Sequence, residues 1–111
     1  MKVFKEEHRI LAKLISPEDW NPGLSFFSDD NEFIQVGTWY YDAGKQLSDH
    51  IHNEFERNTT RTCETIYMVS GSMRVRLYTL NRKLVEIFDI KQGDILILLD
   101  SGHGYEILED G

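Results

Sequence analysis

Short apolar runs alternate with turn-forming residues along most of the chain, and this spacing limits the folds open to it. In residues 73–79, MRVRLYT, apolar and polar side chains alternate with a period of two. Because successive side chains of a strand point to opposite faces, this run predicts a strand with Met73, Val75 and Leu77 toward a core. Further strand-sized runs, bounded by turn residues, are expected at 24–27, 33–41, 45–52, 61–69, 84–90, 95–99 and 105–108.

About eight or nine short strands are typical of an all-β protein, an antiparallel sandwich, barrel or jelly roll. Residues 8–15, HRILAKLI, fit either a helical face or a short strand. Residues 1–7 are expected to form a loose end or an edge strand, and residues 53–60 and 101–104 to form loops. With no internal repeat or linker, residues 1–111 are expected to fold as a single domain.

The charge and composition of the chain limit the classes of partner and the compartment that we expect. The net charge of −7 argues against nucleic acid and against an anionic membrane surface. No apolar run approaches the ~20 residues that span a bilayer. The N-terminal segment breaks its apolar residues with charges, unlike a secretory signal. The single cysteine, Cys63, cannot form an internal disulfide, which suits a reducing compartment. We therefore expect a cytoplasmic protein with no nucleic-acid or membrane partner.

Three side chains in the middle of the chain have the chemistry of metal ligands. His50 and His52 are two residues apart, so in the strand predicted at 45–52 they would share one face. Glu64 lies on the next predicted strand, and a hairpin would bring it opposite the histidines. Two imidazoles and a carboxylate suit a divalent transition metal such as Fe, Zn, Mn or Ni. His103, held between two glycines, is the candidate for a fourth ligand.

Glycines frame these residues in a familiar pattern. The spacing from Gly44 to His50-Ile51-His52, and from Glu64 to Gly71, resembles the first motif of the cupin superfamily, so we take 44–71 as that motif. The gap between His52 and Glu64 is longer than in most cupins. We interpret it as an inserted loop, which costs little because closure entropy grows by only about 0.6 kcal/mol per doubling of length.

Residues 93–105 resemble a degraded second cupin motif. Gly93-Asp94 and the apolar run after it match its start, but there is no proline. Tyr105 stands where the usual histidine ligand would be, and His103 is two residues earlier. In an extended segment these two side chains share a face. Either His103 completes the ligand set, or Tyr105 lines the pocket and the site has three protein ligands.

The resemblance covers about residues 33–110 and implies a double-stranded β-helix, or jelly roll, with a divalent metal inside one end. The ending GHGYEILED resembles that of uncharacterised cupins associated with polysaccharide-biosynthesis genes. The sheet edges of a small jelly roll are often covered by a partner, so a homodimer is expected.

Arginines and one tyrosine are the candidates for contacts to a small-molecule ligand. Arg74 and Arg76 share one face of their predicted strand, and a guanidinium can hold a carboxylate or phosphate with two hydrogen bonds. Tyr105 is the third candidate. The competing interpretation of the arginines is a solvated face opposite the core.

Three functions are compatible with these residues. The first is a metal-dependent enzyme acting on a small polar molecule such as a sugar derivative. The second is a module that binds such a molecule without turnover, because no acid–base pair stands apart from the ligand set. The third is a structural or interaction protein whose histidines hold no metal.

Overall fold

We describe the protein from a computed structural model covering residues 1–111. The chain divides into two compact units. Unit 1 comprises Met1–Asp19 and Arg61–Gly111, and unit 2 comprises Trp20–Thr60. Each unit is described by itself, and the single-domain expectation stays a prediction.

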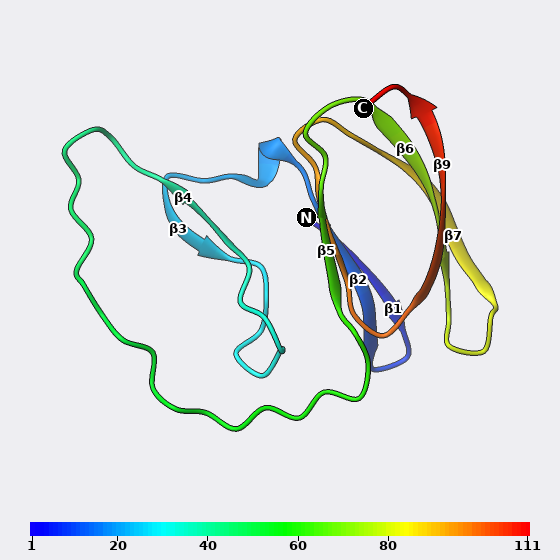
Figure 1. Cartoon of the computed structure of the whole chain (residues 1–111), viewed down its shortest axis with the longest axis horizontal. Helices are drawn as coiled ribbons and strands as arrows, with labels where there is room; N and C mark the ends of the chain where they lie inside the picture. Colours follow the sequence, from blue (N-terminus) through cyan, green and yellow to red (C-terminus); the bar gives the residue numbers. More distant parts are fainter. The chain divides into compact units, whose positions relative to one another are not determined.

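Unit 1 is built from two antiparallel sheets (Figure 1). One sheet has the order β1-β2-β8-β5, with strands β1 (Lys2–Glu6), β2 (Arg9–Ile15), β8 (Ile95–Leu98) and β5 (Glu64–Tyr67). The other has the order β7-β6-β9, with strands β7 (Leu84–Lys91), β6 (Ser72–Tyr78) and β9 (Gly102–Glu109). One 3-10 turn, η1 (Pro17–Asp19), follows β2. The all-β, antiparallel prediction is confirmed, and the sheets do not close into a barrel.

The two sheets of unit 1 share one hydrophobic core. Along β6 the predicted inward residues Met73, Val75 and Leu77 are buried, and the residues between them are only half-buried. Each large apolar side chain that is fully buried contributes roughly 1.5–3 kcal/mol. The rest of the buried cluster comes from both sheets: Phe4, Leu11, Ala12, Ile90, Leu96 and Leu98.

Contacts at one edge also join the two sheets. The rings of Phe4 on β1 and Phe88 on β7 stack with their centroids 4.5 Å apart. Lys2 forms an ion pair with Glu86 beside them. This edge of unit 1 is therefore closed by apolar stacking, with the ion pair on its exposed side.

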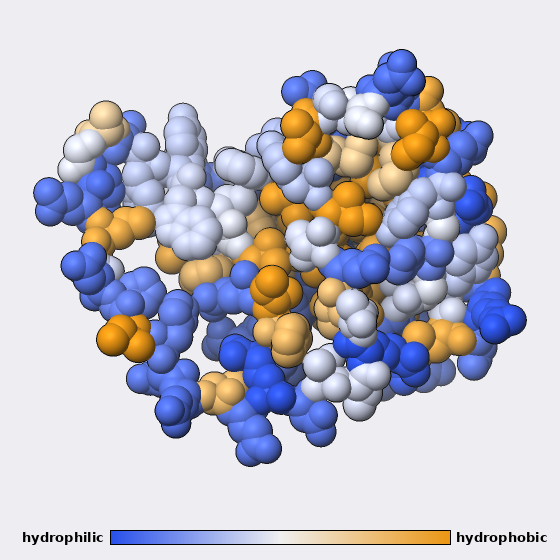
Figure 2. All heavy atoms as spheres, viewed as in Figure 1, coloured by the Kyte–Doolittle hydropathy of each residue, from blue (hydrophilic) through white to orange (hydrophobic).

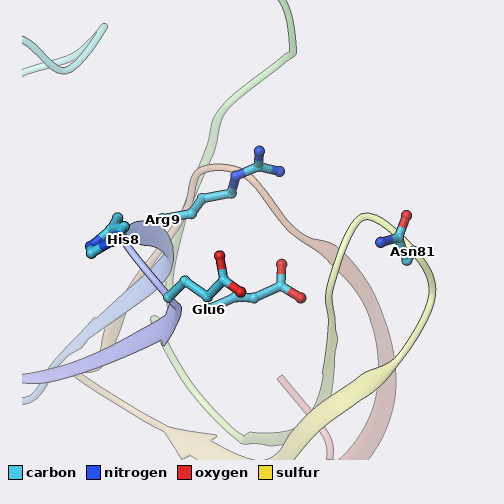
Figure 3. A pocket seen from close by; sticks show the side chains of 5 residues that line it. Glu6, His8, Arg9 and Asn81 are labelled. Carbon is cyan, nitrogen blue, oxygen red and sulfur yellow. The ribbon is translucent and has the colours of Figure 1, made fainter.

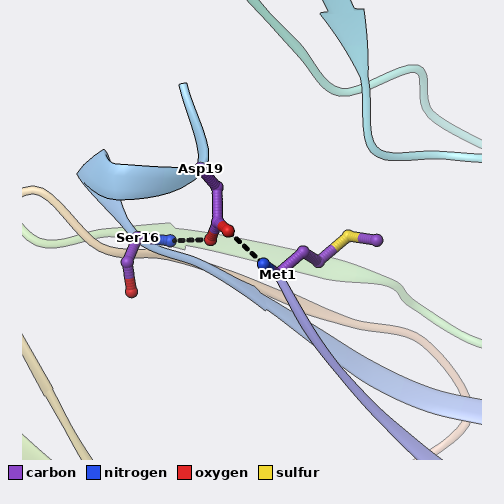
Figure 4. A network of polar contacts seen from close by, with 3 residues as sticks. All are labelled: Met1, Ser16 and Asp19. Carbon is purple, nitrogen blue, oxygen red and sulfur yellow. Dashed lines mark hydrogen bonds and ion pairs between the residues drawn. The ribbon is translucent and has the colours of Figure 1, made fainter. Parts of the chain in front are cut away.

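Asp19 fixes the start of β1 beside the turn that follows β2 (Figure 4). Its carboxylate accepts hydrogen bonds from the N-terminal ammonium of Met1 and, at 2.8 Å, from the backbone N–H of Ser16. Both donors favour the charged form, the ammonium most, and they lower the pKa of Asp19.

Unit 2 contains one hairpin and a long irregular segment. Strands β3 (Gly23–Phe26) and β4 (Gly37–Tyr40) pair in antiparallel fashion, which confirms the predicted hairpin, although β4 is shorter than the predicted run 33–41. Residues 45–60 form no strand. The loop predicted at 53–60 is confirmed, and the strand predicted at 45–52 is wrong.

Unit 2 buries almost nothing of its own. None of the chain's buried hydrophobic side chains belongs to it, and Phe33, Trp39 and Ile51 are 57%, 52% and 95% exposed. Figure 2 shows apolar residues, in orange, exposed on the face in view. Burial of apolar surface is what offsets the entropy lost on ordering a chain. The hairpin of unit 2 therefore lacks the stabilisation that unit 1 obtains from its core.

Partner strands explain where the other predictions differ from the structure. Residues 9–15 form β2 because they pair with both β1 and β8, so the helical alternative is wrong. Residues 2–6 form the expected edge strand. The predicted strand at 61–69 forms only over 64–67, where it pairs with β8. The loop predicted at 101–104 is strand from Gly102 onward, because β9 pairs with β6 from there.

Two motif glycines offer a test of this backbone. Gly44 and Gly71 both have positive φ, 87° and 74°. A Cβ at Gly71 would lie 2.6 Å from the carbonyl oxygen of Asp110, whereas a Cβ at Gly44 would meet nothing within 4 Å. We expect Gly44→Ala to lose at most about 1–2 kcal/mol from backbone strain, and Gly71→Ala to lose clearly more because backbone must also move. Urea denaturation measures both, and equal losses would contradict this packing.

Candidate functional site

Glu64 and His103 meet at the edge of unit 1 formed by β5 and β9. The Oε2 atom of Glu64 and the Nε2 atom of His103 are 3.1 Å apart. Glu64 is paired with Leu98 across β5 and β8, and His103 with Leu77 across β6 and β9. Directly paired residues share a sheet face, and both leucines belong to the core. Both polar side chains therefore point inward from opposite sheets.

Tyr105 extends this cluster along β9. It is paired with Val75, so it shares the inward face with His103, as the sequence predicted for an extended segment. The two rings have their centroids 5.2 Å apart. The phenol oxygen is buried and has no hydrogen-bond partner. Burial, and secondarily the charge of Glu64, raises the pKa of Tyr105 to about 12. Tyr105 therefore keeps its proton at neutral pH and remains a hydrogen-bond donor.

His50 and His52 lie in the irregular segment of unit 2. Their ring centroids are 5.1 Å apart, although no strand aligns them. Nδ1 of His50 lies 3.1 Å from the carbonyl oxygen of Ser48, which can only accept, so the ring nitrogen donates. Both histidines line a cavity of about 780 Å³ in unit 2, together with aromatic side chains that include Trp39.

The four predicted metal ligands thus divide two and two between the units. The hairpin expected to place Glu64 opposite the histidines is wrong, because β5 pairs with β8 and the strand at 45–52 is absent. The structure holds no group of three or more His, Cys, Asp or Glu side chains arranged to bind a metal. The complete ligand set stays a prediction.

The arginines proposed for substrate binding are engaged with protein groups. Arg74 forms a two-pronged ion pair with Asp89, with nitrogen–oxygen distances of 2.8 and 3.1 Å. This pairing raises the pKa of Arg74 and lowers that of Asp89. Arg76 donates to the carbonyl oxygen of Tyr105 at 3.2 Å. A substrate role for either arginine stays a prediction.

A cavity of about 530 Å³ in unit 1 has His103 in its wall. Arg61, Arg82 and Ser101 also line it. In the sequence, Arg82 lies between the strands predicted at 73–79 and 84–90, and Ser101 lies in the loop predicted at 101–104. No sequence signal pointed to either, because the turn after β6 meets the segment before β9 only through the pairing of these two strands, where Tyr78 lies opposite Gly102.

The remaining histidine, His8, lies elsewhere in unit 1. It lines a cavity of about 590 Å³ at the β1–β2 turn with Glu6, Arg9 and Asn81 (Figure 3). His8 and Asn81 lie on opposite sides of this pocket. His8 belongs to none of the predicted ligand sets, which makes it a useful control.

No protein-family model matches this chain, and searches of curated proteins and of solved structures also returned no match. The only helical segment is the short turn η1, so no helix is long and apolar enough to cross a membrane.

The surroundings of Tyr105 predict a pH effect. Its pKa is raised from 10.0 to about 12, so between these values the unfolded chain releases a proton that the folded chain keeps. Stability should therefore fall across this window in the wild type and fall less in Tyr105→Phe. The wild-type minus variant ultraviolet titration should show one tyrosine ionising near pH 12. Glu64→Gln should lower that value only partly, since burial remains. A difference titration centred near pH 10 would contradict this environment.

Proposed function

We propose that the protein is a small jelly-roll protein of the cupin type that binds a divalent transition metal and acts as an enzyme on a small polar molecule. The observation that carries the proposal is the approach of Glu64 to His103. Metal–ligand bonds of about 2.0–2.2 Å at angles between 90° and 109° place neighbouring ligand atoms about 3.0–3.5 Å apart. The 3.1 Å separation of Oε2 and Nε2 falls in this range.

The arrangement of the two sheets also supports the proposal. Two antiparallel sheets share one core, and the Glu64–His103 pair lies on their inner faces, between β5 and β9. The cupin resemblance implies an ion inside one end of a jelly roll. His50 and His52 are the other two proposed ligands, on the strength of the motif spacing. The same 3.1 Å distance fits a hydrogen bond between imidazole and carboxylate, so metal content separates the two interpretations.

Tyr105 is the proposed contact for a substrate oxygen. Its buried hydroxyl has no partner within the protein, and its raised pKa keeps it a donor at neutral pH. A bound divalent ion would supply Lewis-acid polarisation of a substrate oxygen. Glu64 and His103 would hold the ion, and Tyr105 would orient the substrate beside it.

A second function, binding without turnover, is favoured by the same tyrosine. A phenol that keeps its proton to about pH 12 cannot act as a general base near neutrality, and Glu64 and His103 are committed to the ion. Screening the metal-loaded protein for both stabilisation by ligands and product formation decides between the two functions.

Metal content tests the proposal directly. Untagged protein should carry a transition metal by elemental analysis, and replacing His50, His52, Glu64 or His103 by Ala should each reduce affinity. Loss of an outer-sphere partner typically costs 10–100-fold, so loss of a ligand should cost more than about 100-fold. His8→Ala is the matched control, since it removes an imidazole from a different pocket.

Each outcome has a consequence. Absence of metal after reconstitution, or equal loss in His8→Ala, would overturn the site. Loss in Glu64→Ala and His103→Ala with no change in His50→Ala and His52→Ala would restrict the ligand set to unit 1. Far-ultraviolet circular dichroism of each variant checks that the sheets remain folded.

A further inference from the structure

We propose that the unit 1 cavity beside His103 binds a small molecule through its carboxylate or phosphate group, with Arg82 as the main contact. This inference concerns the metal-free protein, and it does not require the proposed metal site. It adds a ligand class and a binding residue that the metal proposal does not contain.

The charge of the cavity runs against that of the chain. The protein has 19 acidic and 12 basic residues, a net charge of −7. No aspartate or glutamate lines this cavity, whereas Arg61 and Arg82 do. A concave site lined by one sign of charge raises the local concentration of the opposite ion. Most of an acidic protein's surface repels anions, so anions should collect at this cavity.

Two carboxylates approach this wall: Glu64, whose Oε2 lies 3.1 Å from Nε2 of His103, and Asp100, which two arginines share. Asp100 Oδ1 lies 3.7 Å from Nε of Arg61, and Asp100 Oδ2 lies 3.8 Å from Nε of Arg9. Both distances exceed those of a charge-assisted hydrogen bond, about 2.7–2.9 Å. Of the two lining arginines, Arg61 has a carboxylate beside it, and Arg82 has none within the protein.

Arg82 is held in an unfavourable backbone conformation. Its φ is 65°, in the left-handed region that glycine or asparagine usually occupies. Its backbone N–H donates to the carbonyl oxygen of Thr79 at 3.0 Å, within the β6–β7 turn. Its guanidinium has no ion pair or hydrogen bond within the protein. Strained residues of this kind gather at ligand sites. Glycine would adopt this backbone conformation with less strain. The backbone therefore does not explain the arginine, and we assign the role to its side chain.

Hydroxyl groups complete the lining. The Ser101 hydroxyl is buried and has no hydrogen-bond partner, and Ser101 lines the cavity. Thr62 and Tyr78 line it as well. Buried polar groups are nearly always hydrogen-bonded, so the Ser101 hydroxyl is a group that a ligand oxygen could satisfy. Guanidinium and hydroxyl donors together match the acceptor oxygens of a carboxylate or phosphate.

The experiment compares a neutral sugar with two anionic derivatives of it. Protein is stripped on a chelating resin, because a soluble chelator is itself a polyanion, and titrated calorimetrically with glucose, glucuronate and glucose 1-phosphate. We expect the two anionic sugars to bind and glucose not to bind. Their affinity should fall as salt is added, since screening weakens exposed charge pairs.

Two arginine variants locate the site. Arg82→Gln should weaken glucuronate and glucose 1-phosphate binding at least about tenfold, through loss of a charge-assisted contact. Arg57→Gln makes the same charge change at a guanidinium that donates to the carbonyl oxygens of Asp30 and Glu32 in unit 2, and it should leave affinity unchanged. Arg82→Gly should lose binding equally while its melting temperature stays the same or rises, because glycine relieves the positive φ. Loss of binding without loss of stability would exclude a purely structural role for Arg82.

Several outcomes would overturn the inference. Glucose binding as tightly as the anionic sugars, none of the three binding, or equal losses in Arg82→Gln and Arg57→Gln would each do so. Binding that appears only in metal-loaded protein would also reject this site while leaving the metal proposal standing. Anion binding by protein that takes up no metal would support this site and reject the metal proposal.

Discussion

The packing of two sheets on one apolar core is the constraint on which unit 1 depends. β6 supplies Met73, Val75 and Leu77 from one side, and β2 and β8 supply Leu11, Leu96 and Leu98 from the other. Every inward position next to these residues is brought toward the opposite sheet. The register of each strand therefore decides which polar side chains face inward, because a slip of one residue would turn its whole face outward.

The two edges of this sandwich are finished differently. Between β1 and β7, Phe4 and Phe88 stack, so the core continues to the edge. Between β5 and β9, the inward positions are Glu64, His103 and Tyr105, and the core gives way to ionisable groups. At this second edge the phenol oxygen of Tyr105 is buried, Glu64 and His103 are partly exposed, and a cavity lies beside His103. The packing that stabilises unit 1 therefore also brings ionisable side chains of the two sheets together, Glu64 from one sheet and His103 and Tyr105 from the other.

How much the sequence predicts depends on whether the partner of a segment is implied by its own pattern. The alternation in residues 73–79 was enough to assign β6 and its buried face, and the two-residue spacing of His103 and Tyr105 was enough to place them on one face. The strand at 45–52 failed because no other strand pairs with it, and an unpaired strand leaves its backbone groups without partners. The helical alternative for 8–15 failed because β1 and β8 lie on either side of it.

By itself, the sequence determined the all-β class, the inward face of β6, and the residue types available for a metal or anion. Those follow from local periodicity and from side-chain chemistry. Only the tertiary structure decided that β5 pairs with β8, that Glu64 lies 3.1 Å from His103, and that Arg82 and Ser101 line one cavity. The reason is that these contacts join strands and turns far apart in the chain, and their register is set by how the two sheets fill the core between them.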